Sequence, residues 1–455
     1  MINEALVNVT QNDGIEKNLT SFNYKIVVLD DDPTGTQTVK DLPVYTEWTE
    51  EWIEDGFKQE NAMFYILTNS RALTEAETIT LHQEISRNIE KVAQKLGQPY
   101  LVISRGDSTL RGHFYLEPKV LSESAQTPFD AVFYLPQFFE GQRYTYHGIH
   151  YLKDEDGFKP VSESEFANDT TFGYEAGNMR DFIAEKSQGV VDAESVFHIT
   201  LEHIRNRDVA AITSIFERVS HFDAVIVDAL NDEDMDYFVA CLTTYLNTHD
   251  KKFIFRTAAS FVKAICQTPG TLIALEQAQN NDYGGVVIVG SHVKKSTDQL
   301  SHLLSHTDIV PIEFDVNAVV REDIDTYIKE QIVRVEQHIQ AQQNVVVFTT
   351  RDVIKTQDLN QNLNISTRIS DSLVSIIQGL SVQPKFIIAK GGITSSDVAT
   401  KGLGIKKAVV LGQIAKGIPV WLTGQEAKYP NMPYIIFPGN VGHVDTLAEV
   451  YDRSH

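Results

Sequence analysis

Two arginines, an aspartate, two glycines and several hydroxyl side chains lie within the ten residues Ser104–His113. The segment follows the apolar run Tyr100–Ile103, which is typical of a buried strand. Arginine binds carboxylates and phosphates, and an aspartate can accept a proton from a hydroxyl. These residues therefore suit a site that binds an anionic, hydroxylated molecule and takes a proton from it. A polar turn closed by an internal Arg–Asp pair is the alternative.

Polar groups also follow two other apolar runs. Asp30–Gly35 follows the run Tyr24–Leu29, and Arg71 follows the run Met63–Leu67. Helical periodicity between the runs predicts a parallel sheet, and ligands of such sheets bind at the carboxyl ends of the strands. We therefore expect these groups to share one cleft with Ser104–His113. A solvated acidic turn is the alternative for Asp30–Gly35.

Two further segments could contribute to ligand binding. Residues 138–174 lose simple periodicity and interleave aromatic residues with Gly, Arg and His, which suits an excursion that covers a cleft. His147 and His150 lack the spacing of a metal site, so we expect ordinary polar or core histidines. Arg256 follows another strand run, at a helix start, where it could hold an anion or cap the helix.

Three turns in the second half share one design, in which a strand is followed by Gly with Ser, Thr or Asn and then by a helix. They are Gly290-Ser291, Gly391-Gly392-Ile393-Thr394-Ser395 and Gly439-Asn440-Val441-Gly442. Glycine lets a phosphate approach the backbone, and a helix start offers unpaired N–H groups. The three turns together favour a phosphate-rich ligand. None matches a P-loop or the G-x-G-x-x-G fingerprint, which disfavours a Rossmann dinucleotide site.

Composition limits the class of protein. The net charge of −23 argues against nucleic acid or an anionic membrane as the main partner, although a small anionic substrate responds to local charge only. The two cysteines, Cys241 and Cys266, indicate a reducing compartment. No apolar run approaches the ~18 residues of a membrane span. We expect a cytoplasmic protein with a loose N-terminal extension over residues 1–23, which are polar and show no signal-peptide pattern.

The fold class follows from the alternation of strand and helix patterns in both halves. We predict two doubly wound α/β domains with mainly parallel sheets and an active-site cleft between them. The polar, glycine-containing stretch Asn280–Gly285 is the best boundary. Residues 24–258 would form the substrate-binding domain, and residues 284–450 would form the nucleotide-binding domain. A small polar anion in one domain and a nucleotide in the other is the layout of a small-molecule kinase.

Four motifs occur in a fixed order: Asp31-Asp32-x-Thr34-Gly35, Asp107-Ser108-Thr109-Leu110-Arg111-Gly112, Gly391-Gly392-x-Thr394-Ser395 and Gly439-Asn440-x-Gly442. With them the chain resembles the four-carbon acid sugar kinase family over roughly Tyr24 to Ala448. The resemblance implies an ATP-dependent kinase that phosphorylates the terminal hydroxyl of a threonate, an erythronate or a 3-oxo-tetronate. Pro33 and the pair Arg105-Gly106 depart from the family's usual residues, which leaves the particular acid sugar open.

The resemblance also implies which residues line each site. The sugar-acid site would contain Asp31, Asp32, Arg71, Asp107, Ser108 and Arg111, and the ATP site would contain Ser291, Gly391, Gly392, Ile393, Thr394 and Gly439. Asp107 or Asp32 would accept the hydroxyl proton, and Arg71 or Arg111 would pair with the substrate carboxylate. ATP and Mg²⁺ are the implied cofactors, with the magnesium ligands left open. A homodimer is one option for the assembly.

Two other classes remain as alternatives. One is a sugar-acid sensor that keeps a nucleotide as a structural ligand. The other is a different sugar-acid enzyme, such as a dehydrogenase or an aldolase. The absent dinucleotide fingerprint counts against a dehydrogenase, and the sequence shows no metal cluster of the kind that an aldolase would need. Release of ADP with a panel of sugar acids would separate a kinase from a sensor.

Overall fold

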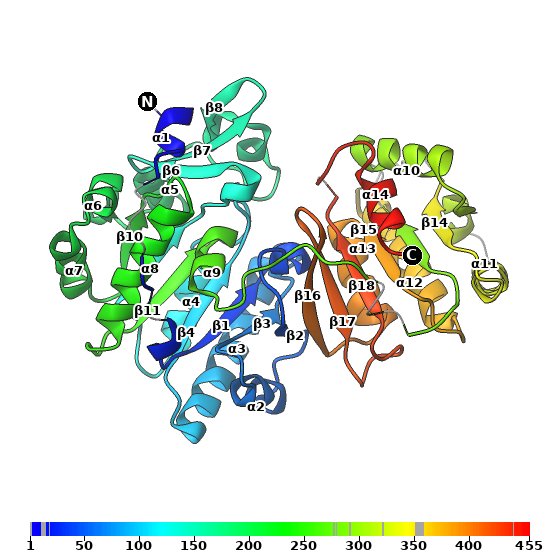
Figure 1. The fold of residues 1–455 in the computed structure, drawn as a ribbon, viewed down its shortest axis with the longest axis horizontal. Helices are drawn as coiled ribbons and strands as arrows, with labels where there is room; N and C mark the ends of the chain where they lie inside the picture. The colour runs from blue at the N-terminus through cyan, green and yellow to red at the C-terminus, as the bar shows by residue number, and fades with distance from the viewer. Residues whose placement is uncertain are drawn as a thin grey trace. The chain divides into compact units, whose positions relative to one another are not determined.

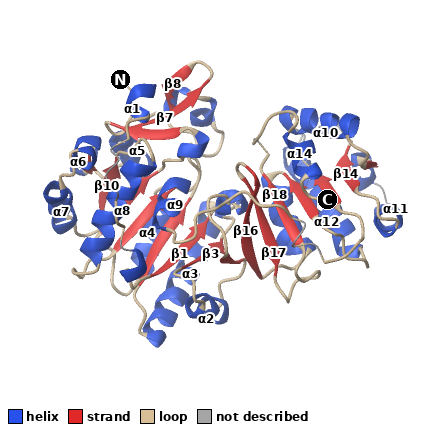
Figure 2. Cartoon of the chain, viewed as in Figure 1, coloured by secondary structure: helices blue, strands red, loops and turns tan. Residues whose placement is uncertain are grey.

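The computed structural model describes residues 2–10, 15–17, 19–275, 278, 280–290, 293–320, 323–350, 359–439 and 441–455. The chain divides into two compact units. The first consists of Met1–Gly35 with Glu47–Pro269, and the second consists of Thr36–Thr46 with Gly270–His455. Strands alternate with helices along most of each unit (Figure 1, Figure 2), and the predicted α/β class with mainly parallel sheets is confirmed.

The main sheet of the first unit has parallel neighbours throughout. In spatial order its strands are β3 (Met63–Leu67), β1 (Lys25–Asp30), β4 (Tyr100–Arg105), β11 (Phe253–Thr257), β5 (Ala131–Leu135), β10 (Asp223–Val227) and β9 (Phe197–Ile199). Every residue of β1, β3, β5 and β11 is buried, as the continuous apolar runs predict for strands covered on both faces.

Helices of the first unit connect and cover these strands. They are α1 (Glu4–Val7), α2 (Glu50–Lys58), α3 (Glu75–Leu96), α4 (Leu116–Ser124), α5 (Met179–Lys186), α6 (Leu201–Arg205), α7 (Val209–Arg218), α8 (Asp232–Leu246) and α9 (Ala259–Ile265). Helix α3 begins where Thr74 and Glu77 form a reciprocal capping box. The expectation of a loose N-terminal extension is wrong for the start of the chain. Ile2 and Val7 are buried against Tyr144 and Leu201, because these apolar side chains find a hydrophobic cluster there.

The irregular segment 138–174 contains a small antiparallel sheet. Its strands are β6 (Arg143–Tyr146), β7 (Ile149–Asp154) and β8 (Gly157–Pro160). Short 3₁₀ turns follow at Val161–Glu163 and Glu165–Asn168. The aromatic residues that break the regular pattern therefore belong to a hairpin and turns inserted between strands β5 and β9.

The strands of the second unit are also hydrogen-bonded side by side. In spatial order the strands are β13 (Val310–Phe314), β14 (Val345–Thr349), β12 (Val286–Val289), β15 (Ile387–Lys390), β18 (Pro433–Phe437), β17 (Ile418–Thr423), β16 (Lys407–Ala415) and β2 (Leu42–Tyr45). The pairs from β13 to β18 are parallel, and the pairs that involve β17 and β16 are antiparallel. Strand β2 comes from the N-terminal part of the chain, and the sequence patterns placed no boundary at residues 36–46.

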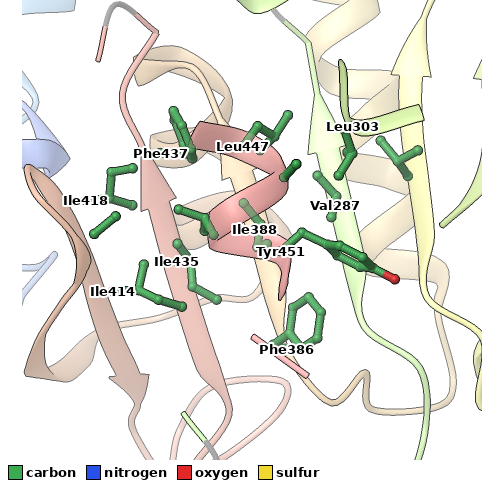
Figure 3. Packing of buried hydrophobic residues seen from close by; sticks show 14 of the residues in the cluster. Val287, Leu303, Phe386, Ile388, Ile414, Ile418, Ile435, Phe437, Leu447 and Tyr451 are labelled. Carbon is green, nitrogen blue, oxygen red and sulfur yellow. The ribbon is translucent and has the colours of Figure 1, made fainter. Parts of the chain in front are cut away.

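Helices of the second unit are α10 (Lys294–His306), α11 (Ile324–Gln340), α12 (Leu359–Gly379), α13 (Gly392–Asp397) and α14 (Thr446–Asp452). The core of this unit packs apolar side chains of the parallel strands against helices (Figure 3). Among them are Val287, Ile388, Phe437, Leu303 and Leu447. This packing fixes the strands whose carboxyl ends carry the glycine turns. Within the described residues, no helix is long and apolar enough to cross a membrane.

Candidate active site

The parallel strands β3, β1 and β4 bring three polar segments to one edge of the first unit's sheet. Asp30 at the end of β1 pairs in register with Leu67 of β3 and with Arg105 of β4. The residues that follow these strands must then lie side by side, because parallel strands share a carboxyl edge. The structure accordingly brings Asp31, Asp32, Arg71, Asp107, Ser108 and Arg111 into one region of this unit.

Arg71 joins the two aspartates that follow β1. Its Nη2 and Nε donate to the Asp31 carboxylate at 2.6 and 3.1 Å, and its Nη1 lies 3.5 Å from Asp32 Oδ2. Burial raises the pKa of Asp31, and Arg71 offsets part of that rise. Asp32 also accepts a hydrogen bond from the Thr34 amide at 2.9 Å. The N–H donors of Arg71 are therefore occupied by Asp31 and Asp32, which they hold in place.

Asp107 lies in a strongly cationic environment. Arg111 Nε donates to Asp107 Oδ2 at 2.9 Å, and the Thr109 hydroxyl donates to the same oxygen. Burial alone would raise the pKa of Asp107, but the charges of Arg71 and Arg111 and these hydrogen bonds hold it at about 2. Asp107 is therefore ionised at neutral pH and can accept a hydrogen bond or a proton from a hydroxyl group.

Arg111 is partly exposed and keeps part of its guanidinium group available. Its Nε contacts Asp107 and the Thr109 hydroxyl, while Nη1 lies 3.8 Å from Asp169. The Phe166 ring stacks near it, with 4.9 Å between Cζ and the ring centroid. Within the described part of the chain, Nη2 donates no hydrogen bond, and about a quarter of the side chain is exposed. Arg111 is thus better placed than Arg71 to pair with a small anion.

A buried ion pair beneath this region was not predicted as part of the site. Glu117 on α4 accepts hydrogen bonds from the hydroxyls of Ser70 and Ser104, at 2.6 and 3.0 Å, and pairs with Arg256 of β11. Burial would raise the pKa of Glu117, but the charge of Arg256, with smaller contributions from neighbouring groups, holds it below its ordinary value. Arg256, for which either an anion-binding or a capping role was left open, forms this internal pair in the structure. Glu117 carries no signal in the sequence, because it looks like an ordinary helix residue.

Asp30 supports the site from below. It is fully buried and lies 3.4 Å from Arg105 Nη1. Burial raises the pKa of Asp30 to about 7. The turn Pro33–Thr36 closes directly over its carboxylate, and a Cβ at Gly35 would lie 1.8 Å from Asp30 Oδ2. Only glycine fits at position 35 without displacing this side chain, so the Thr-Gly pair of the motif has a packing reason.

The excursion 138–174 holds the loop that carries Asp107. His150 Nε2 lies 2.8 Å from the Ser108 carbonyl oxygen, and the Tyr174 hydroxyl donates to the Thr109 carbonyl at 3.1 Å. The next residue, Leu110, has a φ of +67°, which is unfavourable for a side chain of its size. The hydrogen bonds from the excursion help to keep the loop in this conformation. His150 is a buried histidine, as expected.

His150 should be harder to protonate in the folded protein than in the unfolded chain. Burial lowers the pKa of His150 to about 4, below the ordinary value near 6.5 that applies in the unfolded chain. The unfolded state therefore binds more protons between these values, and stability falls as the pH drops from about 6.5 towards 4, by on the order of 1–3 kcal/mol. Urea unfolding of the wild type and His150→Gln across this range should show a shallower pH dependence for the variant. His147→Gln, at an exposed histidine, should retain the wild-type profile, and equal profiles for all three proteins would contradict the assignment.

Of the three predicted nucleotide turns, the turn Gly391–Ser395 lies wholly within the described residues. The other two each contain a residue outside them, Ser291 in one turn and Asn440 in the other. Gly391 directly follows strand β15 with a φ of +116°, a conformation that favours glycine, and helix α13 starts at Gly392. A Cβ at Gly290 would lie 2.6 Å from the Thr394 hydroxyl, so the turns after β12 and β15 are in contact. Ile393 is 69% exposed, and Gly439 follows β18, the other neighbour of β15.

Two models of known protein families match consecutive parts of the chain. A model of a sugar-binding N-terminal domain matches residues 26–265, and a model of a nucleotide-binding C-terminal domain matches residues 286–447. The two domains together are the architecture of the four-carbon acid sugar kinases. The chain belongs to this family, which confirms the resemblance found in its motifs.

Solved structures share the fold at low sequence identity. A Haemophilus influenzae protein, HI1011, matches with a TM-score of 0.62 and 15% identity over 94% of this chain and 99% of its own. A protein from Salmonella typhimurium LT2, provisionally named a tRNA synthase, matches with a TM-score of 0.66 and 16% identity over 94% of this chain and 98% of its own. These similarities support the fold alone. No curated protein matches the chain.

Proposed function

We propose that this protein is an ATP-dependent kinase that phosphorylates the terminal hydroxyl of a four-carbon acid sugar, such as a threonate, an erythronate or a 3-oxo-tetronate. The observation that carries the proposal is the Asp107–Arg111 pair, which places an ionised carboxylate beside a partly free guanidinium group in the sugar-binding domain. The nucleotide-binding domain of the same chain would supply the phosphoryl donor. An acid sugar offers both a carboxylate for the arginine and a hydroxyl for the aspartate.

In this proposal Arg111 pairs with the substrate carboxylate. A guanidinium group suits this task because its parallel N–H donors match the two oxygens of a carboxylate. Arg71 and Asp31 would contribute the polar wall of the same site, and Ser108 would offer a hydroxyl. Because Arg71 is occupied by Asp31 and Asp32, we assign the clamp to Arg111 and a positioning role to Arg71.

Asp107 is the proposed proton acceptor. The substrate hydroxyl oxygen forms a bond to the γ-phosphorus of ATP, its proton passes to Asp107, and the bond between the γ-phosphorus and the β–γ bridging oxygen breaks, so that ADP leaves. Arg111 lowers the pKa of Asp107, so pairing of Arg111 with the substrate carboxylate would weaken this effect and make Asp107 a stronger base. Asp32 is the second candidate, since it lies beside Arg71 on the neighbouring strand end.

The nucleotide would bind at the turns that contain Gly391, Gly392, Ile393, Thr394 and Gly439, together with Ser291. Within the described residues, no group of three or more His, Cys, Asp or Glu side chains is arranged to hold a metal ion. Mg²⁺ in nucleotide sites is commonly held by phosphate oxygens and one or two carboxylates, which need no such group. When bound, Mg²⁺ would neutralise charge on the transferred phosphoryl group.

A panel of acid sugars tests the proposal directly. The purified protein is incubated with ATP, Mg²⁺ and single four-carbon acid sugars, and ADP release is measured by a coupled assay. We expect ADP release that depends on one or a few four-carbon acids and is absent with the matching neutral sugar alcohols, which lack the carboxylate for Arg111. Binding of an acid sugar without ADP release from any member of the panel would favour the sensor interpretation and contradict the kinase.

A further inference from the structure

Lys390 is a buried cation between the nucleotide turns. It is the last residue of β15, and its side chain is fully buried. The ammonium group donates to the carbonyl oxygens of Pro438 and Gly439 at 3.1 and 3.3 Å, and it lies 4.2 Å from the centroid of the Phe437 ring. Among the described residues, no carboxylate lies within ion-pair distance of this lysine.

A buried ammonium group without a carboxylate partner is costly for a folded protein. Two carbonyl oxygens and one aromatic ring compensate only in part. Burial, with a smaller contribution from the positive charge of Lys295 on α10, lowers the pKa of Lys390 to about 7. Among the described residues, Lys295 is the charged side chain whose field acts on Lys390. An anion that approaches Lys390 would therefore offset much of the free-energy cost of burying its charge.

The position of Lys390 in the fold indicates what kind of anion could approach it. Its neighbour Gly391 begins the turn Gly391–Thr394, and its two carbonyl partners lie in the turn that contains Gly439. Strands β12, β15 and β18 are adjacent in the sheet, so both turns and the start of α10 lie at the same edge. All of these residues belong to the matched nucleotide-binding domain.

We propose that the Lys390 side chain binds a phosphate of the nucleotide as an ammonium group, so that a neutral Lys390 amine takes up a proton from the buffer when the nucleotide binds. In the free protein the carbonyl oxygens of Pro438 and Gly439 hold the side chain, and in the complex a phosphate oxygen replaces them as its main partner. The flexible stem of lysine allows this exchange. The inference rests on the proposed function, because it requires the C-terminal domain to bind a nucleotide.

The test measures ADP and adenosine binding by calorimetry for the wild type, Lys390→Met, Lys390→Arg and the control Lys329→Met, which removes an exposed lysine from α11. We expect Lys390→Met to weaken ADP binding at least tenfold and to leave adenosine binding unchanged, because only ADP has phosphates. The control should match the wild type. Since methionine replaces an unpaired buried charge, Lys390→Met should retain or gain thermal stability.

Proton uptake gives a second readout that a structural role would not move. At pH 8 most Lys390 side chains are neutral, so a bound phosphate that raises the pKa of Lys390 draws a proton from the buffer. Calorimetry in two buffers of different ionisation enthalpy should show uptake of close to one proton for the wild type and far less for Lys390→Arg, which is always charged. This comparison holds even where Lys390→Met does not fold.

The outcomes separate this inference from the kinase proposal. If the wild type binds ADP, but Lys390→Met binds it equally well or Lys390→Arg takes up the same proton, Lys390 is structural and the inference is wrong, while the kinase proposal stands. If the wild type binds no nucleotide, the proposed function itself is wrong.

Discussion

Replacement of Asp107 by asparagine should reduce kcat for phosphoryl transfer by a factor of about 100 to 10,000, the usual contribution of a general base. Asparagine keeps the shape of the side chain but cannot accept the hydroxyl proton. Because the anion clamp Arg111 remains, KM for the acid sugar should change much less than kcat. Steady-state ADP release at saturating ATP measures both constants.

Two further variants make the result specific to position 107. Asp156→Asn changes an exposed aspartate of the same unit and should leave kcat unchanged. Asp32→Asn tests the second candidate for the base. If Asp107→Asn and Asp32→Asn both retain near wild-type turnover, neither aspartate is the proton acceptor and the proposed mechanism is wrong.

Replacement of Glu117 by leucine should lower the free energy of unfolding by roughly 3–5 kcal/mol, because it leaves the buried Arg256 guanidinium without its counter-charge. It also removes the acceptor for the hydroxyls of Ser70 and Ser104. Urea unfolding, followed by circular dichroism, measures the loss. The matched control is Glu123→Leu on the same helix, where the glutamate is largely exposed and only loosely paired with Lys119 at 3.8 Å. That change should cost at most ~1 kcal/mol.

A double variant distinguishes an unpaired charge from a simple packing defect. Replacing both Glu117 and Arg256 by methionine removes the whole ion pair and fills the space with apolar atoms. Since paired buried charges can be exchanged for apolar residues at little cost, the double variant should be more stable than Glu117→Leu. If the double variant loses as much stability as Glu117→Met and Arg256→Met lose when summed, the loss comes from altered packing and not from an unpaired charge.

The sequence by itself determined the fold class and the place where polar groups would gather. Short β-branched runs separated by helical patterns can be buried only as strands of a parallel sheet, and the carboxyl ends of such strands share one edge. For this reason the spacing of Asp31, Arg71 and Asp107 after three consecutive runs was enough to predict that they lie together. The order of the motifs was also enough to identify the family.

The tertiary structure decided which partner each charged group has. Composition could not show that Arg71 holds Asp31 while Arg111 holds Asp107, because every pairing of two arginines with these aspartates satisfies the same local pattern. The role of Glu117 could not be predicted for a related reason, since its partner Arg256 lies 139 residues away in the chain. Contacts between residues so distant in sequence leave no local periodicity to detect.

Strand β2 is the clearest case of a feature that only the tertiary structure decides. Its four residues, Leu42–Tyr45, pair with β16 of the second unit, although the chain before Thr36 and from Glu47 to Pro269 belongs to the first. A strand this short has the same sequence pattern wherever it pairs, because its register and partner depend on which sheet edge it meets. The Ser104–His113 loop shows the same division. Its residue types determined the chemistry it can perform, while the hydrogen bonds from His150 and Tyr174 fix the conformation in which it is presented.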